Sequence, residues 1–183
     1  MLTANNVRVF VCRQLTLFTS LLTEYGGVYA DTDHLVLHSL DDFLNRSTVV
    51  GRETNKQIGN GFLIAESGAE FLRIWLSNYT DFQDGQWAVH STIRPHLLAI
   101  DFPHLVRVVD TFFHPNYMEI VAYFNRKKTP TYPWSSRHGL HLYTRLVRQY
   151  VYRKPRLDKQ DHVVADVVRH ILYGDQHACN YTK

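Results

Sequence analysis

The sequence predicts an α/β protein in which helices flank a mixed sheet. Two observations lead to this fold class. Segments with strand-like and helix-like spacing of apolar residues alternate along the chain. The 183 residues are also 45% hydrophobic, which is enough for one substantial core. Because no shift in composition and no internal repeat divides the chain, we predict a single domain over residues 1–183.

The first predicted elements are a short strand followed by a helix. Residues 7–11 alternate valine with other residues, which is typical of a strand. Over residues 15–25, apolar side chains recur every three to four positions, as on one face of a helix. Gly26 and Gly27 follow, and glycines in this place predict the end of that helix.

Residues 28–33 predict the strand that matters most for function. They are aromatic and β-branched before the sequence becomes polar, so we predict a buried strand in the centre of the sheet. Its C-terminal end carries Asp31 and Asp33. Since active sites of open α/β sheets gather at such strand ends, both aspartates are predicted to lie in a cleft.

The rest of the chain continues the alternation. Ser67 and Glu70 form a capping-box pattern that predicts a helix over residues 68–78. A helical stripe of valines and other aliphatic residues over residues 163–172 is followed by Gly174, which predicts a final helix. The remaining predicted elements are four strands and one proline-rich loop, at residues 47–52, 57–65, 106–111, 118–123 and 127–137 respectively.

The spacing of Asp31 and Asp33 indicates a metal site. On an extended chain, side chains two residues apart leave the same face, where two carboxylates repel each other unless a cation or protons intervene. Hard oxygen ligands suit Mg²⁺ or Mn²⁺, which keep coordination positions open for phosphate oxygens. The pattern Asp-x-Asp is common, however, and a solvated turn is the ordinary alternative.

A longer motif gives the pair its context. Residues 25–33 are Tyr-Gly-Gly-Val-Tyr-Ala-Asp-Thr-Asp, and residues 39–42 are Ser-Leu-Asp-Asp. This string resembles the DXD region of glycosyltransferase family 32, which includes the fungal initiating α-1,6-mannosyltransferase and the animal α-1,4-galactosyl- and α-1,4-N-acetylglucosaminyltransferases. The resemblance implies a GT-A fold with a Rossmann-like sheet. It also implies that Asp33 binds the metal directly, while Asp31 reaches the donor ribose, or the metal through water.

The resemblance extends over residues 21–143 and implies further site residues. A histidine followed by leucine and an aromatic residue lies near the metal in the family's final loop, and His141 takes this position here. His141 is therefore the candidate third metal ligand, with an ordinary loop histidine as the alternative. The residues implied to contact the donor are Gly26, Gly27, Tyr29, Asn60 and Trp134. For Asn60 a turn or edge-strand amide, and for Trp134 a packed loop aromatic, is the ordinary alternative.

The activity that the resemblance implies is a metal-dependent sugar transfer with Asp31 and Asp33 as catalytic residues. A hexose or N-acetylhexosamine would pass from a UDP- or GDP-sugar to a glycan or glycolipid acceptor, with retention at the anomeric carbon and with Mn²⁺ or Mg²⁺ as cofactor. No carboxylate is assigned as nucleophile. Asp84 is a speculative acceptor-side group, and a loop aspartate is its ordinary reading.

The motif starts early in the chain, and this affects the expected activity. In the family, additional strands and helices that form the nucleotide pocket precede the motif, so we expect the N-terminal part of the domain to be missing or replaced. Residues 144–183 would form a C-terminal helical extension. We therefore expect little or no transfer by these residues alone, which leaves the enzyme assignment open. A non-catalytic binding module on a transferase scaffold is the main alternative.

A phosphatase of the haloacid-dehalogenase type is a second alternative, with Asp31 as nucleophile and Asp33 as acid/base. Such enzymes need an uninterrupted apolar strand and a downstream lysine with a paired acidic motif. Gly26 and Gly27 interrupt the run before the strand, and no such paired motif follows.

The net charge and short sequence motifs restrict the binding partners and the cellular location that the sequence predicts. The net charge is +3 with a pI near 8.9, and basic residues mix with acidic ones outside residues 145–156, so no nucleic-acid partner is predicted. The basic cluster over residues 145–156 is compatible with contact to pyrophosphate or an anionic acceptor, but a solvated helix face is its ordinary reading, and no role is assigned to it. No apolar run is long enough to span a bilayer. Glycosylation motifs at Asn45, Asn78 and Asn180, together with the family resemblance, predict the Golgi lumen for a longer parent protein. The pairing of Cys12 and Cys179 is left open.

Overall fold

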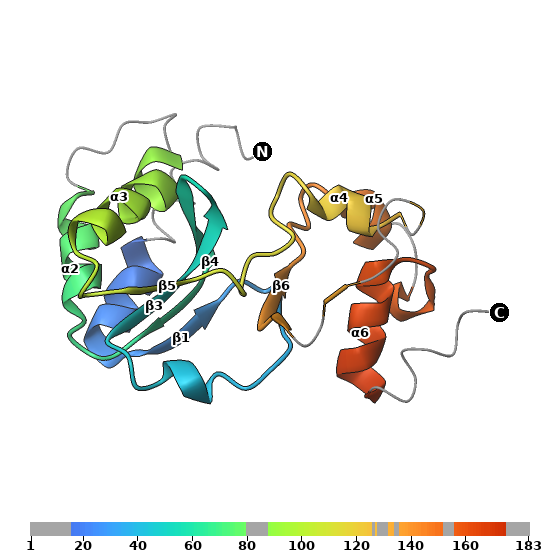
Figure 1. Ribbon diagram of the computed structural model, residues 1–183, viewed down its shortest axis with the longest axis horizontal. Helices are drawn as coiled ribbons and strands as arrows, with labels where there is room; N and C mark the ends of the chain where they lie inside the picture. Colours follow the sequence, from blue (N-terminus) through green and yellow to red (C-terminus); the bar gives the residue numbers. More distant parts are fainter. Residues whose placement is uncertain are drawn as a thin grey trace, which may run out of the picture.

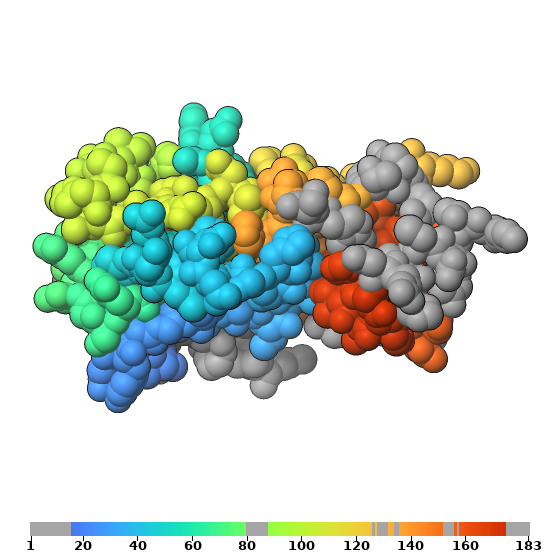
Figure 2. Space-filling model, turned by 60° about the horizontal axis from the view of Figure 1, so that its bottom comes forward, coloured from blue at the N-terminus to red at the C-terminus, as the bar shows by residue number. Residues whose placement is uncertain are grey.

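The computed structural model is an elongated body with a sheet at one end and short helices at the other (Figure 1). Figure 2 shows the same elongated shape in a second view, with the first described segments at one end and the last helix near the opposite end. The parts of the chain that the structure describes are residues 16–79, 88–125, 127, 132–133, 136–151 and 156–174.

The main sheet has four strands in the order β1-β4-β3-β5. Strands β1 (Gly27–Ala30) and β3 (Thr48–Thr54) are both antiparallel to β4 (Gln57–Ala65), which lies between them. Strand β5 (Arg107–Val109) pairs in parallel with β3. The prediction of a mixed sheet flanked by helices is confirmed, and so are the strands predicted around β3, β4 and β5.

The place of β1 in the sheet contradicts its predicted central position. Among the described strands β1 pairs with β4 alone and therefore lies at the sheet edge, with the side chain of Val28 45% exposed. The strand also ends at Ala30, so Asp31 and Asp33 lie in the turn that follows it. A short apolar run indicates a strand but does not distinguish a central strand from an edge strand, which explains the error.

Residues 118–123 contain another wrong prediction, because a short helix, α4 (Ile120–Tyr123), forms where a strand was expected. Polar side chains fix a turn just before it. The Asn116 backbone N–H donates to Glu119 Oε2 over 3.1 Å, and the Met118 N–H donates to Asn116 Oδ1 over 2.9 Å. Such local bonds favour turn and helix geometry over an extended strand.

Helices cover one face of the sheet (Figure 1). They are the helix over residues 16–25, α2 (Glu70–Ser77), a π-helical turn η2 (Val89–Ile93) and α3 (Arg94–Asp101). A buried cluster joins them to the sheet through Leu22, Val50, Leu63, Phe71, Trp75 and Leu98. The helix at 16–25 ends before Gly26, whose φ is +70°, as predicted.

The predicted capping box of α2 is wrong, although the helix itself is confirmed. Ala69 is the N-cap residue and makes no side-chain cap bond. Ser67 is used elsewhere, since its Oγ donates to the Glu24 backbone carbonyl over 2.7 Å. The hydroxyl therefore ties the loop before α2 to the end of the first helix.

The opposite face of the sheet packs against residues 41–43 and against the part of the chain that follows β5. Side chains alternate along β4, so that Phe62 and Ile64 belong to a second buried cluster with Phe112, Leu140 and Val163. The elements on this side are η1 (Asp41–Phe43), α4, β6 (Gly139–His141), α5 (Arg148–Val151), η4 (Leu157–Lys159) and α6 (Val163–Tyr173). Helix α6 and its ending at Gly174 are confirmed.

Several predictions fall on residues that the structure does not describe. They concern the strand at 7–11, much of the loop at 127–137, and the side chains of Cys12, Asp84, Trp134, Cys179 and Asn180. Within the described residues, no helix combines the length and apolar character that crossing a membrane requires.

Candidate metal centre

A two-stranded ribbon brings distant parts of the chain together at the end of β1. Strand β2 (His34–Val36) pairs antiparallel with β6, and His34 lies opposite His141. The backbone of Asp31 is fixed at the same time, because its N–H donates to the Gly61 carbonyl of β4 over 2.8 Å. The sequence did not predict β2 or β6, each of which has three residues.

Asp31, Asp33 and His141 converge at this point. Each offers one ligand atom, and the three atoms lie within 4.8 Å of one another. His141 Nε2 lies 3.0 Å from Asp33 Oδ1 and 3.7 Å from Asp31 Oδ2. The three residues predicted as metal ligands are thus brought together, and the group could hold a metal ion.

Asp33 is held rigidly by the loop after β6. Its Oδ2 accepts hydrogen bonds from the Thr144 backbone N–H over 2.8 Å and from the Thr144 Oγ1 hydroxyl over 2.9 Å. Burial favours the protonated carboxyl, but the bonds from His141 and Thr144 outweigh burial and hold the pKa of Asp33 well below its usual value. The Asp33 carboxylate is therefore ionised and held in one orientation at neutral pH.

Asp31 is oriented from the other side by Tyr29. The Tyr29 hydroxyl donates to Asp31 Oδ1 over 2.6 Å, and its ring stacks on Phe18 with centroids 3.8 Å apart and planes 14° apart. Burial, followed by this bond to Asp31, raises the pKa of the Tyr29 hydroxyl, which stays a donor. The second carboxylate oxygen of Asp31 faces His141.

Gly61 leaves the space in which the ligands meet. A Cβ at this position would lie 2.7 Å from Asp31 Oδ2 and 3.1 Å from His141 Cε1. The β4 backbone at Gly61 thus leaves room for the Asp31 carboxylate and the His141 imidazole. This set of oxygen and nitrogen donors fits a divalent ion such as Mn²⁺, while Mg²⁺ would favour the oxygens.

We predict that Gly61→Ala lowers the affinity for Mn²⁺ about tenfold, because the added methyl group displaces the Asp31 carboxylate and the His141 ring. Isothermal titration calorimetry with Mn²⁺ measures the effect. The thermal unfolding midpoint, recorded alongside, separates a local displacement from a loss of fold. Equal Mn²⁺ affinity in the two proteins would contradict the role of Gly61.

The three candidate ligands line a cavity of about 430 Å³. Tyr29 and Asn60, two of the predicted donor contacts, also line it. Gly26 and Gly27 do not belong to its lining and lie at the other end of β1, where Gly26 packs against the backbone of Ser67. Their contact with the donor stays a prediction, as does that of Trp134, which is outside the described residues.

Sequence reasoning missed several residues of this cavity. Phe18, Glu53, Tyr143 and Arg145 line it, and Thr144 both lines it and binds Asp33. Thr144 and Arg145 fall in the segment predicted as a helical extension. Arg145 belongs to the basic cluster for which contact with pyrophosphate was considered without assigning a role. The only sequence signal of Thr144 was its position directly after the His-Leu-Tyr motif, which no local pattern connects to residues 31–33.

Comparisons with known proteins point to sugar transfer. The chain is 32% identical over 102 residues to glucan organizing enzyme 1 of Cryptococcus neoformans var. grubii. The aligned region covers 49% of this chain and 28% of that protein. It is 30% identical over 66 residues to human lactosylceramide 4-alpha-galactosyltransferase, with 36% of this chain and 18% of that protein covered. The gorilla enzyme of the same name is also 30% identical over 66 residues.

These matches support a distant relationship to glycosyltransferases at low identity and partial coverage. The chain spans less than a third of the length of each of these relatives. No family model matches the chain, and no solved structure matches it significantly.

Proposed function

We propose that this chain carries the metal centre and part of the donor site of a glycosyltransferase. The protein would transfer a hexose or N-acetylhexosamine from a UDP- or GDP-sugar to a glycan or glycolipid acceptor, with retention. The observation that carries the proposal is the convergence of Asp31, Asp33 and His141 on the wall of a cavity of about 430 Å³. The similarity to a galactosyltransferase supports the same reaction class.

The chemistry depends on how the ligands are held. A divalent ion bound there would supply positive charge to the diphosphate that departs when the glycosidic bond breaks. Thr144 fixes Asp33 and Tyr29 fixes Asp31, so both carboxylates are oriented before any ligand arrives. Such preorganised groups need no rearrangement as charge develops. Tyr29 and Asn60, both on the cavity wall, would contact the donor.

The location proposed for the protein is the Golgi lumen, as expected of a transferase that builds glycans. Asn45, the first of the three glycosylation motifs, lies in an exposed turn and is accessible to modification. Asn78 is less accessible, because its side-chain amide donates to the Ile74 carbonyl at the end of α2 over 2.8 Å.

The test of the proposal is metal-linked nucleotide binding. We expect UDP or GDP to bind in the presence of Mn²⁺, to be released by a chelator, and to bind again when Mn²⁺ is restored, since the diphosphate would reach the protein through the ion. Calorimetry with each nucleotide, with and without chelator, measures this. Nucleotide affinity that is the same with and without metal would contradict the proposal. Binding without any donor hydrolysis or transfer would favour the non-catalytic alternative.

A further inference from the structure

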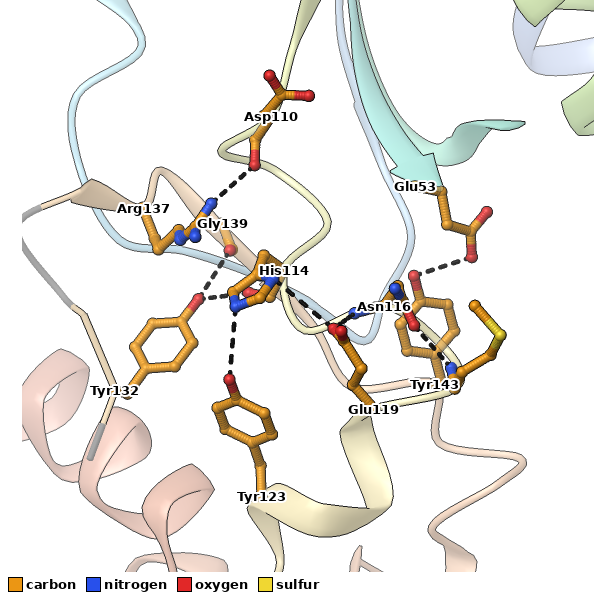
Figure 3. Close-up of polar contacts among 11 residues, drawn as sticks. Glu53, Asp110, His114, Asn116, Glu119, Tyr123, Tyr132, Arg137, Gly139 and Tyr143 are labelled. Atoms are coloured by element: carbon orange, nitrogen blue, oxygen red, sulfur yellow. Dashed lines mark hydrogen bonds and ion pairs between the residues drawn. The ribbon is translucent and has the colours of Figure 1, made fainter. Parts of the chain in front are cut away.

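The cavity contains a third carboxylate that the metal centre does not use. Glu53 lies near the end of β3, and its side chain is on the cavity wall. Tyr143 donates its hydroxyl hydrogen to Glu53 Oε1 over 2.9 Å. Figure 3 shows the second carboxylate oxygen pointing away from Tyr143, with no contact to the other residues drawn.

Tyr143 fixes the position of Glu53 relative to the metal centre. The Tyr143 ring packs on the His141 ring with centroids 4.0 Å apart, while its hydroxyl reaches Glu53. Tyr143 is only 8% exposed, so its ring has a defined place. The Tyr143 side chain therefore lies between Glu53 and the proposed metal ligand His141 and contacts both.

The same geometry separates Glu53 from the metal centre. Its carboxylate is not among the described ligand atoms that lie within 4.8 Å of one another, so it lies outside the candidate metal centre. Within the described residues, Tyr143 binds Oε1, and the side chain of Glu53 is only partly buried. Oε2 is not a buried atom without a partner, so it is accessible to a ligand in the cavity.

The surroundings of Glu53 match the chemistry of a sugar ring. Gln57 and Asn60 on the neighbouring strand β4 line the same cavity and offer amide donors and acceptors. Tyr117, which is 39% exposed, adds aromatic surface to the wall, against which the C–H face of a pyranose can pack. Sugar hydroxyls are neutral donors, and a carboxylate oxygen is their strongest acceptor.

We infer that Glu53, held by Tyr143, is a positioning residue that accepts a hydrogen bond from a hydroxyl group of a sugar lying beside the metal centre. The inference rests on the proposed function, which places the diphosphate at Asp31, Asp33 and His141. The sugar then lies on the Glu53 side of the cavity. It is either the sugar of the donor or that of the acceptor, and the experiment below separates the two.

The variant that tests this is Glu53→Gln. The glutamine carbonyl can still accept the Tyr143 bond, while its NH₂ group puts a donor where the carboxylate presents an acceptor. The matched control is Glu66→Gln, since Glu66 is exposed in the loop before α2. Tyr143→Phe is a second variant, which leaves the carboxylate but removes the bond that orients it.

The affinities for four kinds of ligand are measured for each protein. Calorimetry gives the affinity for Mn²⁺ and then, with Mn²⁺ present, for UDP and GDP and for their hexose conjugates. Saturation-transfer NMR gives the affinity for a panel of methyl hexosides, which needs no nucleotide.

We expect Glu53→Gln to keep Mn²⁺ and nucleotide affinities within about twofold and to weaken sugar binding about tenfold, as for loss of a charged hydrogen bond. Tyr143→Phe should weaken sugar binding by a smaller factor. A loss confined to the nucleotide-sugars assigns Glu53 to the donor sugar, whereas a loss confined to the methyl hexosides assigns it to the acceptor.

Wild-type sugar affinities in Glu53→Gln would overturn the inference, as would a parallel loss of Mn²⁺ affinity. If the unchanged protein bound neither class of sugar, the inference would also fail. If it bound methyl hexosides through Glu53 but neither Mn²⁺ nor nucleotide, the proposed function would fail and the sugar site would stand.

Discussion

Asp33→Asn is expected to reduce Mn²⁺ affinity by more than about 100-fold, and to remove metal-dependent nucleotide binding with it. Loss of an outer hydrogen-bond partner alone typically costs about 10- to 100-fold, and Asp33 is a proposed direct ligand. The asparagine carbonyl can keep the bonds from Thr144, so the loop after β6 stays in place. Its NH₂ group then faces His141 and the ion, where it repels the cation and supplies no lone pair.

Calorimetric titration with Mn²⁺ measures this loss, with thermal unfolding as a check on the fold. Asp101→Asn is the matched control, because Asp101 is exposed at the end of α3 and far along the chain from the candidate ligands. Equal Mn²⁺ affinity in Asp33→Asn and in the unchanged protein would rule out Asp33 as a ligand. Asp33→Ala should bind no better, since it also leaves Thr144 and His141 without their acceptor.

His34 should make the metal-free protein lose stability steeply in acid. Its ring stacks on Phe62 with centroids 4.6 Å apart, and within the described residues neither ring nitrogen has a hydrogen-bond partner. Burial, with a smaller effect from His141, lowers the pKa of His34 from 6.5 to about 3. The imidazole is therefore neutral in the folded protein over most of the acid range.

The sign of the effect follows from proton uptake on unfolding. Above pH 6.5 the ring is neutral in both states and has no influence. Below that pH the unfolded chain binds a proton that the folded chain excludes, so the free energy of unfolding falls by about 1.4 kcal/mol for each pH unit. The loss continues down to the folded pKa of about 3 and amounts to at most about 5 kcal/mol.

Urea unfolding in the presence of a chelator, at several pH values between 7.5 and 4, measures this contribution. His34→Leu has a side chain of similar size that cannot titrate, so its stability should depend less on pH by about 1.4 kcal/mol per unit. His104→Leu, which replaces an exposed histidine, is the control and should keep the original slope. The same slope in His34→Leu and in the unchanged protein would disprove the role of His34.

The correct predictions of the fold came from local patterns. The strand at β4, the helix at α2 and the helix at α6 each contain enough periodic apolar residues to be recognised without knowledge of their neighbours. Where polar side chains bond the backbone locally, as before α4, the same apolar residues form a helix instead of a strand. The edge position of β1 depends on which strands pair, and spacing carries no information about that.

The residues of the candidate site that belong to short sequence motifs could be predicted. Asp31 and Asp33 are two residues apart, and His141 was found through a resemblance that includes its neighbours. Thr144 and Glu53 were missed because they reach the site only through β6 and β3, and their contacts join positions 111 and 90 residues apart. No window of sequence contains such a pair, so the pairing of the strands had to be known first.

The ribbon of β2 and β6 has a consequence for how the protein folds. Asp33 and His141 are 108 residues apart, so closing the site encloses more than half of the chain in a single loop. Closing a loop of this length lowers the entropy of the chain before the contact between Asp33 and His141 contributes any stability. The site is therefore expected to form late in folding. A nascent chain that has not yet emerged past β6 therefore has both aspartates but lacks His141. The candidate metal centre can form only after synthesis has passed residue 141.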